Sequence, residues 1–170
     1  MHPVLRHLFE QIQTSNHTIY LEFDESDGGC HCLAGLFTIE QLDPAGLRNV
    51  GVIKLYLQNI EHASTEPPAG SKDEFIPMAG LKKLDRYAEV FGHELAHAVD
   101  ILFNQERAAL VDSILKQTDQ VLQQRVHSKD IKPEWEVELR QRDAFFTELE
   151  KPALIAEEQI WRELRQHRRE

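Results

Sequence analysis

The sequence predicts an α+β fold that is mainly helical, and two observations lead to that prediction. Short runs of alternating apolar, β-branched and aromatic residues are confined to residues 1–62. From residue 81 to residue 130 there is no proline and a single glycine, Gly92, which favours helix throughout. We therefore expect a small N-terminal twisted sheet followed by a helical C-terminal half.

The expected elements follow in chain order. Strands are predicted at residues 18–23, 33–39 and 51–58, because each run is apolar or alternating and is bounded by polar or glycine-containing segments. The proline- and glycine-rich composition of residues 63–80 predicts a loop, either a lid or a linker. Residues 81–130 are expected to form two helices that break near Phe103 and Asn104. Pro133 and Pro152 each occupy a typical first-turn position, which predicts two further helices.

Length and composition indicate one domain over residues 1–170, with a strand-rich part at 1–62, the loop at 63–80 and a helical part at 81–170. Acidic side chains number 29 against 19 basic ones, a formal net charge of −10 that argues against nucleic acid as a partner. The sequence contains neither a signal peptide nor an apolar run long enough to span a bilayer, so we expect a cytoplasmic protein, or a translocated effector, with no membrane partner. The sequence leaves the oligomeric state open.

The pattern His-Glu-Leu-Ala-His at residues 93–97 lies within the first of the long predicted helices. Two histidines at positions i and i+4 lie above one another on a helix, so His93 and His97 can both reach one Zn²⁺ ion. Glu94 lies beside them, where it can take a proton from a zinc-bound water while the ion polarises a carbonyl group. This pattern predicts peptide hydrolysis with Glu94 as the catalytic base.

A catalytic zinc ion usually has three protein ligands, so a third ligand is required. No third histidine lies close by in the sequence, because the next one is His127. The helix expected to begin at Pro152 offers Glu157, near the centre of its apolar face, and Glu158, toward the edge of that face. A carboxylate on a buried face needs a partner, so we expect the third ligand to be Glu157 or Glu158. An ion pair with Arg162 or Arg165 is the alternative for both residues.

Other residues are secondary candidates. Asp100 follows His97 by one helical turn and could accept the second ring N–H of a ligating histidine, or form an ion pair instead. Transition-state stabilisation needs a donor, and the sequence leaves four candidates open. These are Tyr56, Tyr87, Arg165 and His167.

The HExxH motif at residues 93–97, with a glutamate about sixty residues later, resembles the gluzincin group of zinc metallopeptidases. Its extension to Asp100, and the Pro152-Ala153 start of the glutamate helix, is similar to the Mlc titration factor family of bacterial metallopeptidases. The Glu157-Glu158 pair is also similar to small metalloprotease effectors and to the light chains of clostridial neurotoxins. The resemblance implies a zincin-like fold in which His93, His97 and a helix-borne glutamate bind zinc and Glu94 is the base. In zincins the edge strand of the sheet lies along the cleft and pairs with extended substrate, so the resemblance also implies that residues 52–58 are that strand here.

These observations predict a zinc metallopeptidase that acts on a peptide or protein substrate. The alternative is a catalytically inactive zincin-like domain that uses a structural or sensory zinc ion and binds a protein partner. A structural site would be closed by a fourth protein ligand, for which Cys30, His31, Cys32 and Glu158 are available.

Overall fold

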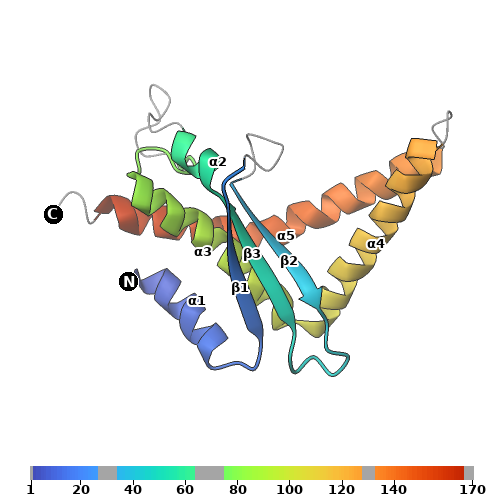
Figure 1. Cartoon of the computed structure of the whole chain (residues 1–170), viewed down its shortest axis with the longest axis horizontal. Coiled ribbons are helices and arrows are strands. Elements are labelled where there is room, and N and C mark those ends of the chain that lie inside the picture. The colour runs from blue at the N-terminus through green and yellow to red at the C-terminus, as the bar shows by residue number, and fades with distance from the viewer. Residues whose placement is uncertain (1, 27–33, 64–74, 128–132, 167–170) are drawn as a thin grey trace.

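The computed structural model of the chain describes residues 2–26, 34–63, 75–127 and 133–166. It contains helices before, after and beside a three-stranded sheet (Figure 1), which confirms the α+β, mainly helical prediction. The elements, in order, are α1 (Pro3–Gln13), β1 (Thr18–Asp24), β2 (Gly35–Gln41), β3 (Val50–Tyr56), α2 (Leu57–His62), α3 (Lys83–Leu102), α4 (Gln105–His127) and α5 (Pro133–Gln166).

The strand order of the sheet is β1-β3-β2, with β1 parallel and β2 antiparallel to β3. Ile53 and Leu55 of β3 point into the core, and Phe37 of β2 lies opposite Ile53 on the same face. Gly51 makes room for the Phe37 ring, because a β-carbon at residue 51 would lie 2.4 Å from Phe37 Cε2. The core face of β2 is thereby fixed against α3.

The prediction that residues 52–58 form the strand along the cleft is wrong. β3 ends at Tyr56, where α2 begins, and it is the central strand with a partner on both sides. Its backbone hydrogen-bonding groups are therefore used within the sheet. β2 is the edge strand on the side of α4 and α5 (Figure 1), so it takes the place expected for β3.

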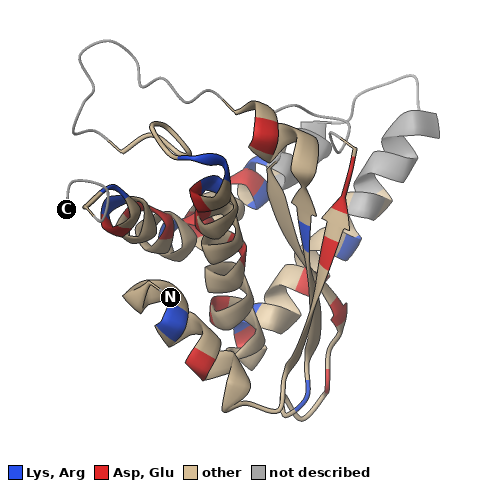
Figure 2. Cartoon of the chain, turned by 60° about the vertical axis from the view of Figure 1, so that its left-hand side comes forward, with Lys and Arg blue, Asp and Glu red and all other residues tan. Residues whose placement is uncertain are grey.

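Helix α3 lies between the sheet and α5, and α1 lies on the same side of the sheet (Figure 2). The buried residues Leu95 and Ala98 of α3 contribute to the core cluster that includes Ile53 and Leu55. The opposite side of α3 packs closely on α5 at Gly92, where a β-carbon would lie 2.2 Å from Ile160 Cδ1. The predicted break between the two long helices is confirmed, since α3 ends at Leu102 and α4 begins at Gln105.

The prediction of two separate helices after residue 132 is wrong, because α5 is continuous and Pro152 lies inside it. A proline within a helix removes one backbone hydrogen bond and costs about 3 kcal/mol. Buried side chains recur at helical spacing on both sides of Pro152, and their packing offsets that cost. They are Leu149, Ala153, Ala156, Ile160 and Leu164.

Among the described residues, no helix combines the length and the hydropathy that a membrane span requires.

Candidate metal centre

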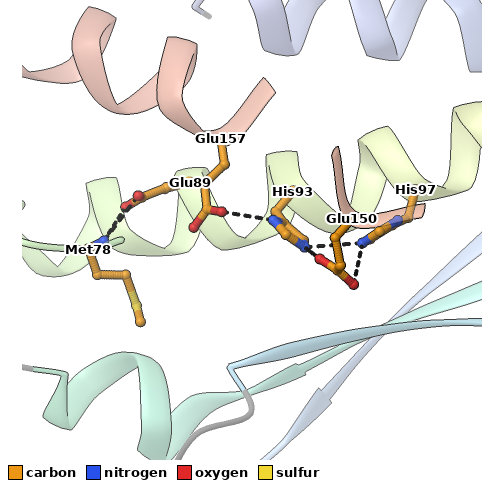
Figure 3. Close-up of polar contacts among 6 residues, drawn as sticks. All are labelled: Met78, Glu89, His93, His97, Glu150 and Glu157. Atoms are coloured by element: carbon orange, nitrogen blue, oxygen red, sulfur yellow. Dashed lines mark hydrogen bonds and ion pairs between the residues drawn. The ribbon is translucent and has the colours of Figure 1, made fainter. Parts of the chain in front are cut away.

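His93 and His97 lie on the face of α3 that is turned toward α5 (Figure 3). They are one helical turn apart, and their Nε2 atoms are 3.1 Å from each other. Two imidazole nitrogens this close, in rings that meet edge to face, point at a common space beside the helix. The structure thus brings together the two histidine nitrogens that the sequence predicts as metal ligands.

Glu150 of α5 completes this convergence from the opposite side. Its Oε2 atom is 3.2 Å from His93 Nε2, and its Oε1 atom is 3.4 Å from His97 Nε2. Tetrahedral ligands about 2.0–2.1 Å from a zinc ion are separated from one another by about 3.3 Å. Each of these contacts is close to that spacing, and the three residues form a group that could hold a metal ion. A His₂Glu set has the chemistry of a catalytic zinc site.

Glu157 contacts the other nitrogen of His93. Its Oε2 atom lies 2.8 Å from His93 Nδ1, and the Glu157 side chain is buried. A carboxylate in this position accepts the Nδ1 hydrogen, so Nε2, which faces Glu150 and His97, is the ring nitrogen that could bind a metal ion. Glu150 and Glu157 are seven residues apart, two helical turns, so one face of α5 supplies both carboxylates.

The cluster has a strongly negative environment. Burial lowers the pKa of His93, but the hydrogen bonds that its ring donates to Glu150 and Glu157, with the negative charges of Glu157 and Glu94, outweigh this effect and raise that pKa to about 10. Hydrogen bonds from His93 and His97 hold the pKa of Glu150 well below its usual range. A positive charge is therefore strongly favoured between these side chains, whether it is a proton or a metal cation.

Glu94 lies on the sheet side of the cluster, against β2. Burial raises its pKa, while His93, His97 and a hydrogen bond from the backbone N–H of Phe37 act in the opposite direction. Gly35 allows this close approach, since a β-carbon there would lie 2.7 Å from both Cγ and Oε1 of Glu94. The edge strand thus fixes the carboxylate beside the histidines.

A second buried carboxylate, Glu89, lies one turn before His93 on the same face of α3 (Figure 3). Both of its oxygens accept the backbone N–H of Met78, at 3.0 and 2.9 Å. Burial raises the pKa of Glu89 to about 8. Met78 has a left-handed backbone, with φ of 59°, so Glu89 stabilises an unfavourable turn next to the site.

The metal-ligand cluster and Glu94 open into one cavity of about 580 Å³. Its walls come from β2, the Pro77–Met78 turn, α3, α4 and α5. His93, Glu94, His97, Glu150 and Glu157 supply its charged or titratable surface, and most of the remaining lining is apolar. The cluster is therefore reachable by a ligand that lies along the edge strand.

The structure differs from the prediction in the residue that it brings to the Nε2 atoms. Glu157 lies on the Nδ1 side of His93, and Glu158 pairs with Arg162, with 2.6 Å between Oε1 and Nη2. Glu150 occupies the position expected for one of these two glutamates. Asp100 forms an ion pair with Arg107 and does not contact a histidine. The ion pair is the alternative role predicted for this residue.

The three described candidates for transition-state stabilisation, Tyr56, Tyr87 and Arg165, do not line the cavity. Tyr87 donates its hydroxyl hydrogen to Glu61 at 2.8 Å, and the Arg165 guanidinium stacks 4.4 Å from the centre of the Trp161 ring. Tyr56 does not line the cavity, and His167 lies outside the described residues, as do Cys30, His31 and Cys32. Among the described lining residues there is no tyrosine, arginine or lysine.

Glu150 was missed because Pro152 was interpreted as the start of a helix. That interpretation separates Glu150 from Glu157, whereas a continuous helix places them on one face at a spacing of two turns. The apolar stripe that continues from Leu149 to Ala153 is the sequence signal that could have identified it.

A comparison with family models, characterised proteins and solved structures finds no match to this chain.

The cluster predicts a specific effect of Glu150→Gln on metal affinity. Losing a residue that only hydrogen-bonds to a metal ligand typically weakens metal binding by about 10–100-fold. Glu150→Gln removes an anionic donor from the cluster itself, so Zn²⁺ binding should weaken by more than that factor. The measurement is a competition titration with a chromophoric chelator. Glu148→Gln is the matched control, since Glu148 is exposed on the same helix and pairs with Lys151. Wild-type affinity in Glu150→Gln would contradict the assignment.

Proposed function

We propose that this protein is a zinc-dependent peptidase of gluzincin type, with His93, His97 and Glu150 as the metal ligands and Glu94 as the base. The observation that carries the proposal is the convergence of three side chains in a cavity that also contains Glu94. The two histidine Nε2 atoms are 3.1 Å apart, and the two carboxylate oxygens of Glu150 lie 3.2 Å from His93 Nε2 and 3.4 Å from His97 Nε2. A three-ligand site leaves a fourth position for water or substrate, as hydrolysis requires.

Zinc, when bound, would supply a positive charge that polarises the scissile carbonyl and makes water more acidic. Glu94 accepts the proton that water loses as its oxygen attacks the carbonyl carbon. The same carboxyl group then delivers that proton to the nitrogen of the leaving amine, while the C–N bond breaks. Burial favours the protonated form of Glu94 and so increases its basicity, which suits a group that alternates between base and acid.

Glu157 is a positioning residue in this proposal. Its hydrogen bond to His93 Nδ1 holds the ring in the tautomer and orientation that present Nε2 to the metal. Glu89 is not hydrogen-bonded to either histidine. It accepts the backbone N–H of Met78 and so holds the turn that forms one wall of the cavity. Neither residue needs to touch the substrate.

Strand β2 provides a place for an extended peptide. The backbone N–H of Tyr56 donates to the carbonyl oxygen of Ala34 at 3.0 Å, so Ala34 belongs to a hydrogen-bonded pair with β3. By alternation, the backbone groups of Gly35, Phe37 and Ile39 point away from β3, toward the cavity that these residues line. The Phe37 N–H donates to Glu94, which leaves the carbonyl of Phe37 and the backbone groups of Gly35 and Ile39 for a peptide. A substrate strand that pairs with this edge would lie across the histidines.

The alternative function, an inactive domain with a structural or sensory zinc ion, requires a fourth protein ligand. The metal-ligand group found among the described residues has three members. Cys30, His31 and Cys32 lie outside the described residues, so the two functions are best separated by activity and metal content together.

Glu94→Gln should separate metal binding from catalysis. Glutamine keeps the size of the side chain but cannot take a proton, so the rate of peptide cleavage should fall by about 10²–10⁴-fold. Zinc content, measured by elemental analysis, should remain at about one ion per chain because Glu94 is not a ligand. If wild type and Glu94→Gln both hold zinc and neither cleaves a broad fluorogenic peptide library, the inactive-domain function is favoured. A wild-type protein without zinc would refute the peptidase and the inactive-domain functions alike.

Gly35→Ala should impair catalysis without removing the metal. The new methyl group would lie 2.7 Å from Glu94 Oε1 and would displace that carboxylate from its place beside β2. A shift of about 1 Å in a catalytic group costs up to about 100-fold in rate, so we expect a loss of 10-fold or more with zinc affinity unchanged. Glu40→Ala, an exposed position on the same strand, is the control. Unchanged cleavage in Gly35→Ala would contradict the role given to Glu94.

A further inference from the structure

The cavity continues past the metal cluster into an apolar pocket between β2 and the α4–α5 pair. Ile101 lies one helical turn beyond His97 on α3, and Ile39 lies two residues beyond Phe37 on β2. Helices α4 and α5 close the far side. We call this part of the cavity the distal pocket; its walls are Ile39, Ile101, Val111, Leu115, Phe146 and Leu149.

The walls of the distal pocket are buried at the base and exposed at the rim. Ile101, Val111 and Leu149 are buried members of one hydrophobic cluster, against which Ile39 and Phe146 pack. Leu115, in contrast, lines the cavity and yet is 43% exposed. An exposed apolar rim above a preformed apolar base is typical of a surface that a ligand covers.

The charge pattern of the cavity restricts what this ligand can be. The described lining contains carboxylates but neither lysine nor arginine, so an acidic group would meet repulsion without a partner. Its carboxylates, Glu94, Glu150 and Glu157, are all engaged at the histidines or at β2. The distal pocket itself offers no charged group to a basic side chain, which leaves an apolar side chain as the complementary ligand.

We infer that the distal pocket binds a large aliphatic or aromatic side chain of the substrate, close to the scissile bond. The inference rests on the proposed peptidase function and adds a substrate class to it. An extended peptide on β2 would direct alternate side chains toward the same face as Phe37 and Ile39, and that face lines the cavity. The pocket would therefore select one position of the substrate.

The test uses two matched variants of α4. Leu115→Asp places a charge at the rim of the distal pocket. Leu110→Asp, the control, places a charge on the same helix at a residue that does not line the cavity. The two residues are similarly exposed, Leu115 by 43% and Leu110 by 48%. Zinc-loaded wild-type protein and both variants are assayed with a peptide library whose cleavage sites are read by mass spectrometry. In parallel, binding of the neutral apolar dye N-phenyl-1-naphthylamine is followed by fluorescence.

Wild type and Leu110→Asp should cleave peptides with Leu, Ile, Val, Met or Phe at one fixed position near the cut, and both should bind the dye. Leu115→Asp should lose about 10-fold or more in kcat/KM for those peptides and should weaken dye binding by a similar factor. Cleavage without an apolar preference, or equal behaviour of the two variants, would overturn the inference and leave the peptidase function standing. Dye binding that only Leu115→Asp weakens, with no peptide cleaved, would support the pocket and refute the peptidase.

Discussion

The contact between the histidine face of α3 and the glutamate face of α5 is the interaction on which the rest of the site depends. His93 lies between two carboxylates of α5, with Glu157 at Nδ1 and Glu150 at Nε2, at 2.8 and 3.2 Å. Buried groups of opposite charge are stable together only when their hydrogen bonds are satisfied. Because Glu150 and Glu157 are two helical turns apart on one face of α5, two regular helices can give both nitrogens of His93 a partner without an irregular loop.

The sheet contributes the other half of the site through its edge strand. Two close approaches make this possible, one of Glu94 against Gly35 and one of Phe37 across Gly51. At both positions the absence of a side chain allows a neighbouring group to occupy the space. The base, the ligands and the open strand edge therefore belong to elements that are packed together, and a site held by packed elements keeps its geometry better than one built on loops.

The sequence predicted the parts of this arrangement that depend on local pattern. The histidine pair, the three strands and the break after α3 follow from spacing and composition within short segments. The parts that failed depend on tertiary packing: Pro152 was expected to begin a helix, but the buried stripe from Leu149 to Leu164 continues α5 through it. A helix that begins at Pro152 excludes Glu150, so the sequence does not predict this residue as a ligand. The central position of β3 depends on how the strands pair, which the sequence of β3 alone does not determine.

The central claim is that Glu150, and not Glu157, shares one metal ion with His93 and His97. It is tested most directly by the absorption spectrum of the Co²⁺-loaded Glu150→Cys and Glu157→Cys variants. A thiolate bound to Co²⁺ gives an intense near-ultraviolet charge-transfer band, because soft sulfur ligands donate strongly to such metals. The structure predicts this band in Glu150→Cys and its absence in Glu157→Cys. The band in Glu157→Cys alone would contradict the ligand set.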